Sequence, residues 1–397
     1  EAGTALTTGD NNVAIGFEAL KTEDTHGFNV AIGYQALKTL NAGQEGYHTA
    51  VGYLAGTAMT TAFANTVVGG LAGDAITEGN NNVAVGVLSL SAETEGSKNT
   101  AVGYGTLEAQ NFTSATDAYN TAVGFSAGND ITTGSLNTLI GANSGDALTT
   151  GLTNVALGYG SLTSDTAGHR STALGYNTLQ NQNLSSSTDT YNTAVGYQAG
   201  ISVTTGLHNV LMGGFAGDAL TDADYNVAIG GLALSSDTQG SNSVAIGYRA
   251  LTTQNNSSAT NANQTAIGTN AGASCTTANS CVFVGHGAGT AHTTGTHSIY
   301  IGRDAGYHGT PMTTGSQNIF IGSFTDGDAN DTGAMIVMGY NVTSVGNQNF
   351  TFGNNVTDSN IAHGATSITA PSDERYKEEI TTSTAGLSFI NDLRPVT

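Results

Sequence analysis

Short segments in which small and apolar residues alternate recur along most of the chain, and each ends in glycine. The segment Asn12–Gly16 is one example, and close copies begin at Asn29, Asn154 and Asn226. Alternation with a period of two, rich in β-branched residues and closed by glycine, predicts a short half-buried strand that runs into a tight turn. One such strand buries little surface, so we expect many of them to stack on one another.

The glycines that end these segments are evenly spaced. They lie at positions 16, 33, 52, 69, 86, 103, 124, 141, 158, 175, 196, 213, 230, 247, 268, 285 and 302. A fixed period is typical of a solenoid, in which each repeat adds one rung, meaning one strand and the connection that follows it; here most rungs have about 17 residues. From Gly103 onward, every fourth rung is longer than the others. The sequence therefore predicts an all-β fold, a parallel β-solenoid or β-roll fibre.

Two kinds of rung alternate in pairs. The fourth residue after the strand glycine is leucine in two successive rungs (Leu90 and Leu107) and glycine in the next two (Gly128 and Gly145). The longer rungs carry their added, mostly polar residues in segments 110–114, 181–185 and 254–258. Because polar segments between strands are typical of loops, we expect these three to protrude at regular heights.

Thr-Thr-Gly segments lie between the strands, for example at residues 132–134, 204–206 and 293–295. Glycine adopts positive φ angles at no steric cost, and a tight corner often requires such an angle. We therefore expect the glycines of these segments to have positive φ.

Composition narrows the class of protein. The 397 residues include 55 glycines, 3 prolines and no tryptophan, and the formal net charge is -21. An acidic chain lacks the basic face that nucleic acid or an anionic membrane requires. We find no apolar run long enough for membrane insertion and no secretion signal. Residues 2–9 read as the end of a rung, so we expect any anchoring segment to lie upstream.

The pattern divides the chain into three parts. Residues 1–321 form the repetitive shaft, and residues 322–371 form an irregular distal β region in which the spacing of the glycines loosens. Charged residues become dense in the segment 372–397, where Leu387, Ile390 and Leu393 follow at helical spacing. That spacing predicts a short segment that is partly α-helical. The apolar layer of each rung is thin relative to the residues that must be ordered, so we expect neighbouring chains to share a core.

The strand repeat resembles the YadA-type head repeat of trimeric autotransporter adhesins. The likeness covers roughly residues 1 to 360 and rests on strands such as Asn226–Gly230. It implies a parallel β-roll with three chains side by side, a homotrimer. The rung of this chain is longer than the usual rung of that family.

The last residues resemble the start of an endosialidase-type intramolecular chaperone domain. The likeness rests on the segment Ser372–Ile380 (SDERYKEEI) and on the Leu-Arg-Pro sequence that begins at Leu393. Such domains end many phage tail fibres and tailspikes, trimerise, and then cut themselves off. The resemblance implies that Ser372 is the nucleophile and Lys377 its general base, in an autoproteolysis that cuts the Pro371–Ser372 bond once. A serine hydroxyl needs such a base, and a lysine serves when it is neutral.

Each of the other candidate sites allows two interpretations. Cys275 and Cys281 are either a disulfide or a pair of buried thiols. The segment Asp326–Asp331 offers calcium ligands, but its glycine is not at the sixth place of a calcium loop and no glutamate stands at the twelfth, so we favour a solvated turn. Four histidines near the distal end suggest a metal site around a threefold axis, although no close pair supports it: His286, His292, His297 and His308.

Tyrosines and carboxylates complete the candidates. Tyrosines that follow the strand glycine either bind sugar or stack on one another, and the absence of tryptophan favours stacking: Tyr34, Tyr53, Tyr104, Tyr159, Tyr176, Tyr197 and Tyr248. A glycan-cleaving enzyme needs two carboxylates across one groove. Asp165, Asp222 and Asp237 are scattered among turns, and no distinct catalytic insertion accompanies them.

We interpret the chain as the structural shaft of a bacteriophage tail fibre or tailspike, part of an extracellular virion tail used in host attachment. Expected partners are two further copies, other virion tail proteins and a host cell-surface glycan or receptor. We expect no cofactor, no metal, no nucleic acid and no enzymatic activity beyond the single self-cleavage. The alternatives are a trimeric adhesin on the bacterial cell surface, a polysaccharide-degrading tailspike, and an ice-binding protein.

Overall fold

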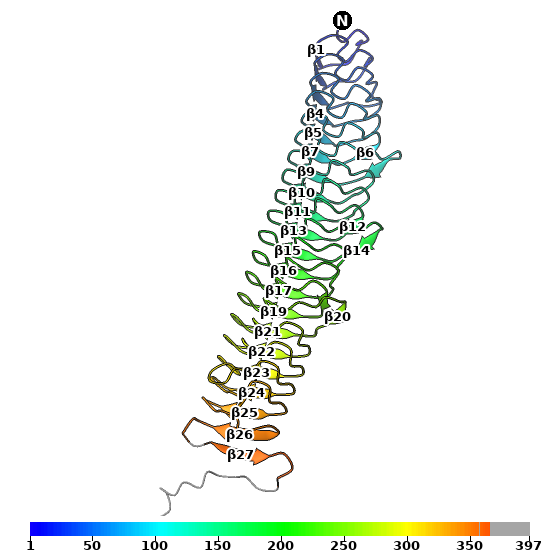
Figure 1. Cartoon of the computed structure of the whole chain (residues 1–397). Helices are drawn as coiled ribbons and strands as arrows, with labels where there is room; N and C mark the ends of the chain where they lie inside the picture. Colours follow the sequence, from blue (N-terminus) through cyan, green and yellow to red (C-terminus); the bar gives the residue numbers. More distant parts are fainter. Residues whose placement is uncertain (357, 366–397) are drawn as a thin grey trace, which may run out of the picture.

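The protein is a parallel β-solenoid, seen in a computed structural model as a long rod of stacked rungs (Figure 1). The structure describes residues 1–356 and 358–365. Strands, turns and bends make up all the assigned structure in these residues, which contain no helix. The predicted fold class is therefore confirmed for them, whereas the predicted α-containing segment 372–397 lies outside them.

The main sheet runs along the whole rod. Within the described residues it contains 21 strands: β1 (Val13–Ile15), β2 (Val30–Ile32), β3 (Thr49–Val51), β4 (Thr66–Val68), β5 (Val83–Val85), β7 (Thr100–Val102), β9 (Thr121–Val123), β10 (Thr138–Ile140), β11 (Val155–Leu157), β13 (Thr172–Leu174), β15 (Thr193–Val195), β16 (Val210–Met212), β17 (Val227–Ile229), β19 (Val244–Ile246), β21 (Thr265–Ile267), β22 (Val282–Val284), β23 (Ile299–Ile301), β24 (Ile319–Ile321), β25 (Ile336–Gly339), β26 (Asn349–Gly353) and β27 (Ser359–Ala362).

Neighbouring rungs are in register. In the pairing of β11 with β13, Val155 lies beside Thr172, and the next two residues of each strand follow in step. The middle residue of every main-sheet strand from β2 to β24 is buried, while the residues on either side are half-buried or exposed. This is the period-2 geometry that the sequence predicts. Among the described strands, only the last pair, β26 with β27, is antiparallel.

A ladder of side-chain hydrogen bonds runs inside the rod at the residue just before each main-sheet strand from β1 to β25, called here the ladder position. Asn137 is typical: its Nδ2 donates to Gly151 O (2.9 Å), and its Oδ1 accepts the N–H of Asn154 one rung further on (2.9 Å). The side chain therefore joins two rungs directly. Asparagine gives way to other residues at a few ladder positions: His48, Ser171, Ser243, Gln264, Cys281, Ser298 and Met335.

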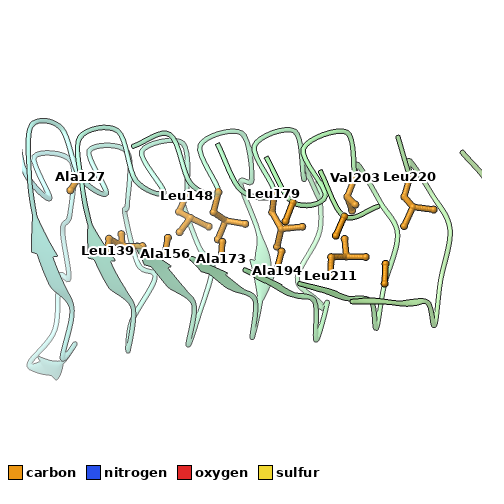
Figure 2. Close-up of a cluster of buried hydrophobic side chains, with 14 of the residues drawn as sticks. Ala127, Leu139, Leu148, Ala156, Ala173, Leu179, Ala194, Val203, Leu211 and Leu220 are labelled. Carbon is orange, nitrogen blue, oxygen red and sulfur yellow. The ribbon is translucent and has the colours of Figure 1, made fainter. Parts of the chain in front are cut away.

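Leucine rungs and glycine rungs fill the interior of the rod with different side chains. In a leucine rung, Leu107 fills the interior and the buried residue three positions later, Gln110, is polar. In a glycine rung, Ile131 occupies the space beside Gly128. A Cβ at Gly128 would lie 2.8 Å from Cδ1 of Leu139, so the interior has no room for a larger residue there. Figure 2 shows how such side chains fill the rod between the sheet and the opposite connections.

The glycines of the Thr-Thr-Gly segments do not have the positive φ that we expected. They matter because the next rung passes too close for a side chain. A Cβ at Gly134 would lie 2.5 Å from Gly151 O, and one at Gly206 would lie 2.4 Å from Ala223 O. Positive φ occurs instead at the strand glycines and at several non-glycine positions, such as Leu107 (φ 52°).

Three flaps protrude from the rod, as the added residues predict (Figure 1). Each flap is a two-stranded parallel sheet: β6 (Gly96–Ser97) with β8 (Thr116–Asp117), β12 (Gly168–His169) with β14 (Thr188–Asp189), and β18 (Gly240–Ser241) with β20 (Thr260–Asn261). They occur once in every four rungs because the longer rung returns once in each four-rung unit.

The interior changes towards the distal end. Alanine is the usual middle residue of a strand, but Phe283, Tyr300 and Phe320 take this place in successive rungs. Their rings stack inside the rod, with centroids 5.4 and 5.2 Å apart. Parallel pairing nevertheless continues through β24, β25 and β26, past residue 321.

Candidate functional site

The outer face of the main sheet points away from the interior of the rod and runs along its length. It is formed by the first and third residues of the main-sheet strands from β1 to β25. The first residues are valine, threonine or isoleucine, and the third residues are isoleucine, valine, leucine or methionine. Several are exposed, including Ile15 at 58%, Leu157 at 46% and Ile267 at 40%.

No charged residue belongs to this outer face, although the chain carries 39 charged side chains in all, nine basic and thirty acidic. Hydrophobic residues at single surface positions are ordinary in soluble proteins. An uncharged strip as long as the sheet is not ordinary, because its third residues form an unbroken apolar row, and contiguous exposed apolar surface normally marks a binding surface. The outer face is therefore the candidate functional site of the part of the chain that the structure describes.

Aromatic side chains border the outer face on the side where the strands end. They belong to the residue after the strand glycine: Phe17, Tyr34, Tyr53, Tyr104, Phe125, Tyr159, Tyr176, Tyr197 and Tyr248. Tyr176 stacks on Tyr159 and on Tyr197, with centroids 5.5 and 5.3 Å apart. The stacking interpretation is confirmed for six of the seven tyrosines; Tyr248 stacks on no ring among the described residues, since Gly231 and Thr269 hold its position in the neighbouring rungs. Stacked rings cover one another's faces and leave their edges exposed, whereas a sugar would need an open face.

Ion pairs mark the other border at two of the flaps. Lys98 Nζ lies 2.6 Å from Asp117 Oδ2 and 5.1 Å from the ring centroid of Tyr119. The next four-rung unit repeats this arrangement with Arg170, Asp189 and Tyr191. At the third flap the equivalent residues are all asparagines: Asn242, Asn261 and Asn263. The third flap thus lacks both the basic and the acidic residue of the pair, and the border has no net charge at any of the three flaps.

Four buried carboxylates hold the bases of the long connections, and the sequence analysis missed this role: Glu23, Glu93, Asp165 and Asp237. Asp165 accepts hydrogen bonds from the N–H groups of Gly168 (3.0 Å) and Leu184 (3.2 Å) and from Gln182 Nε2 (2.6 Å). Asp237 lies four rungs further on, so the two do not face one groove.

A repeated pair of residues could have revealed three of these carboxylates. Glu93, Asp165 and Asp237 hold the same place in successive four-rung units, and each is followed one rung later by a glutamine: Gln110, Gln182 and Gln254. In the structure that glutamine donates to the carboxylate in all three units. An acidic residue followed one rung later by a glutamine, repeated in each four-rung unit, therefore indicates these buried carboxylates from the sequence.

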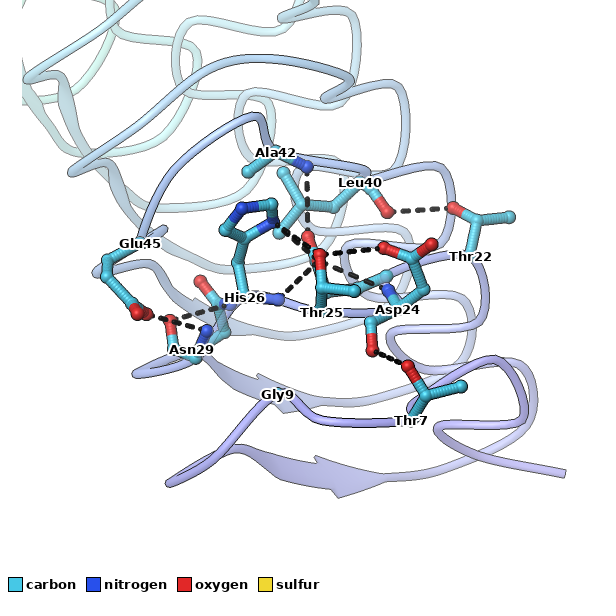
Figure 3. Close-up of polar contacts among 12 residues, drawn as sticks. Thr7, Gly9, Thr22, Asp24, Thr25, His26, Asn29, Leu40, Ala42 and Glu45 are labelled. Carbon is cyan, nitrogen blue, oxygen red and sulfur yellow. Dashed lines mark hydrogen bonds and ion pairs between the residues drawn. The ribbon is translucent and has the colours of Figure 1, made fainter.

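Glu23, Asp24 and His26 form the one cluster of possible metal ligands within the described residues (Figure 3). Glu23 Oε1 accepts the N–H groups of Asp24 (3.2 Å) and His26 (3.0 Å), and Oε2 accepts the N–H of Ala42 (3.0 Å). Three backbone N–H groups thus bind the one buried carboxylate of this cluster. This corner is therefore built to anchor the backbone.

The two cysteines lie inside the rod beside a histidine. Cys275 and Cys281 are free thiols and fully buried, so the structure has the second of the two states that we considered. Cys281 Sγ lies 3.8 Å from Nε2 of His292, and Nδ1 of His292 lies 3.1 Å from the hydroxyl of Tyr300. Burial raises the pKa of Cys281 to about 11 and lowers the pKa of His292. At neutral pH both groups are uncharged.

The remaining candidates lie apart from one another. In the segment Asp326–Asp331, Asp328, Asn330 and Asp331 are exposed, as a solvated turn predicts. Asp326 differs, because it is buried and accepts the N–H groups of His308 and Gly309. Burial raises the pKa of Asp326. His286 is exposed near Asp304, away from buried His292. Ser372 and Lys377 lie outside the described residues.

Comparison with family models, with curated proteins and with solved structures finds no match. Among the residues that the structure describes, none belongs to a helix long and apolar enough to cross a membrane.

Proposed function

We propose that this chain is the structural shaft of a bacteriophage tail fibre or tailspike, in which three copies lie side by side along their outer faces. The shaft would belong to an extracellular virion tail. Its work would be to hold a part that binds a host cell-surface glycan or receptor at a distance from other virion tail proteins. The number of chains and the viral setting come from the two resemblances, to the trimeric adhesin repeat and to the chaperone domain.

The observation that carries the proposal is the uncharged outer face, with its unbroken row of apolar third residues. It repeats at one strand spacing, about 4.8 Å, for nineteen strands, so it would extend roughly 90 Å. A partner that covers it needs the same repeat distance and a comparable length, and a second copy of this chain has both. Two copies with a net charge of -21 repel each other, and an uncharged face is where they approach at least cost.

A shaft also explains what the interior is used for. The ladder asparagines and the buried carboxylates form hydrogen bonds with backbone groups of their own or the next rung. Their polar atoms therefore hold the rungs in place. Asp165 and Asp237 have no free groove between them, which gives the alternative of a polysaccharide-degrading tailspike no support from these residues. The trimeric surface adhesin uses the same kind of shaft and would be told apart by the cell compartment in which the chain is found.

The experiment that tests the proposal is the native mass of the intact chain, by native mass spectrometry without heating. We expect three chains. Ile140→Glu with Leu157→Glu places charges on the outer face and should lower the mass to that of one chain. Thr133→Glu with Thr150→Glu adds the same two charges at exposed turns away from the face and should leave three chains. A single-chain mass for the unaltered protein, or a trimer that survives both outer-face glutamates, would contradict the proposal.

Self-cleavage is tested separately. We propose that Ser372 attacks the carbonyl of Pro371 with Lys377 as the base, which follows from the chaperone resemblance alone. Intact mass of the incubated chain should show release of residues 372–397, and Ser372→Ala and Lys377→Ala should each abolish it. Release that persists in Ser372→Ala would exclude this nucleophile.

A further inference from the structure

The two cysteines of the chain occupy two neighbouring positions inside one corner of the rod. Cys275 lies seven residues after a strand glycine, and Cys281 holds the ladder position of the next rung. In the equivalent rung nearer the N-terminus these positions belong to Met59 and Asn65, and Asn65 Nδ2 lies 4.0 Å from Sδ of Met59. Met59 and Asn65 thus touch across the turn between them. At the cysteine corner, Nε2 of Gln264 lies 3.5 Å from Cys275 Sγ, and Oε1 of the same side chain accepts the N–H of Cys281 (3.2 Å), so one residue contacts both cysteines.

Cysteine at the ladder position forms weaker hydrogen bonds than the usual asparagine. An asparagine there donates and accepts good hydrogen bonds, as Asn137 does, whereas a thiol is a weak donor and acceptor. Cys281 Sγ makes only the weak contacts of a thiol, with Asn279 O (3.4 Å), Gly295 O (3.5 Å) and His292 Nε2 (3.8 Å). Packing alone does not explain why both cysteines of a 397-residue chain lie at a single corner, at the positions that Met59 and Asn65 hold in the equivalent rung.

We propose that Cys275 and Cys281 are a disulfide site, a clip that closes the corner 276–280 when the chain folds in an oxidising medium. The two thiols each lose a proton and an electron as the Sγ–Sγ bond forms. A small-molecule disulfide such as oxidised glutathione takes up both electrons and both protons and leaves as two thiols.

The state of the clip is fixed at the time of folding. Both cysteines are fully buried in the folded rod, so neither an oxidant nor a reductant reaches them without local unfolding. Burial, together with the neighbouring Cys281, also raises the pKa of Cys275, so the reactive thiolate is scarce. A chain that folds in a reducing cytoplasm keeps two thiols after release, whereas an exported chain that folds in an oxidising medium carries the bond.

The test uses cell-free synthesis of the whole chain, so that the medium during folding is controlled. One sample is made with reduced glutathione and a second with oxidised glutathione. A third is made with reduced glutathione, purified, and then exposed to oxidised glutathione without unfolding. Intact mass and thiol titration in guanidinium are measured for all three. We expect two thiols in the first and third samples, and in the second a mass lower by two hydrogen atoms with no thiol.

The matched control is Cys281→Asn, which restores the ladder side chain and removes one partner. Made with oxidised glutathione, it should keep one thiol after unfolding, with no internal bond and no bound glutathione. The proposal is overturned if the second sample keeps both thiols or carries glutathione, or if the third oxidises as readily as the second. None of these outcomes depends on the number of chains in the shaft, so this test and the mass measurement above fail independently.

Discussion

The side-chain oxygen of Asn137 accepts a hydrogen bond from the backbone N–H of Asn154, one rung further along the rod, at 2.9 Å. The amide nitrogen of the same side chain donates to Gly151 O. A side chain that is fully buried thus pairs two backbone groups of the next rung inside the rod. Repeated along the rod, this arrangement fixes the spacing of strand and corner together.

Asn137→Ala should lower the free energy of unfolding by about 2 to 4 kcal/mol, because it leaves two buried backbone groups without partners and opens a small cavity. Chemical denaturation measures this loss. Asn41→Ala is the control, since Asn41 is exposed and its side chain makes no hydrogen bond with the described residues. Equal effects of the two substitutions would mean that the ladder does not stabilise the rod.

Gly128→Ala should destabilise the rod by about 1 to 3 kcal/mol, because the added Cβ would meet Leu139 and Leu107 at 2.8 and 2.9 Å. The backbone at Gly128 also has a φ of 59°, which alanine adopts poorly. Gly70→Ala is the matched control, since a Cβ there has nothing within 4 Å. Melting temperatures of the two variants should differ clearly, and a tolerated Gly128→Ala would refute the tight packing of the interior at this glycine.

Acid should destabilise the rod through His48, which holds a ladder position. Its Nε2 donates to Ala62 O (2.9 Å) and its Nδ1 accepts the N–H of Asn65 (3.2 Å), so the neutral ring imitates asparagine. Burial lowers the pKa of His48 below its usual value of 6.5, although the nearby charge of Glu23 opposes this shift. The unfolded chain therefore takes up the proton first as the pH falls.

The stability that neutral His48 contributes is complete above about pH 6.5, and it falls by at most about 1.4 kcal/mol per pH unit below that value. His48→Asn keeps the ladder and removes the proton site, so its melting temperature should drop less between about pH 7.5 and about pH 5. The measurement is thermal unfolding of both proteins across this range. Identical pH profiles would show that His48 stays neutral or contributes nothing.

Asp165→Asn should loosen the second flap. The substitution turns one accepting oxygen into an NH₂ group that faces N–H donors from Gly168, Leu184 or Gln182, at a cost of about 2 to 4 kcal/mol. Hydrogen exchange in residues 184–189 should become faster while the main sheet keeps its protection. Asp222→Asn, at an exposed carboxylate, is the control and should leave exchange unchanged.

Features that follow from the repeat of equivalent positions were predictable. The strands, the rung length and the height of the flaps follow from the spacing of glycine and of alternating apolar residues, and the tyrosines stack because the same position recurs one rung later. The Thr-Thr-Gly glycines show the limit of this reasoning. Their turn composition suggested a backbone angle, whereas the close passage of Gly151 O past Gly134 is the real constraint.

The sequence by itself determined that this chain is a parallel β-solenoid, because a regular repeat with one short strand per rung can bury its apolar positions only by stacking. The tertiary structure decided which side chains meet between rungs. Asp165 with Leu184, and His48 with Asn65, are 19 and 17 residues apart in sequence. Such partners depend on how one turn of the rod lies over the next, which no local pattern contains.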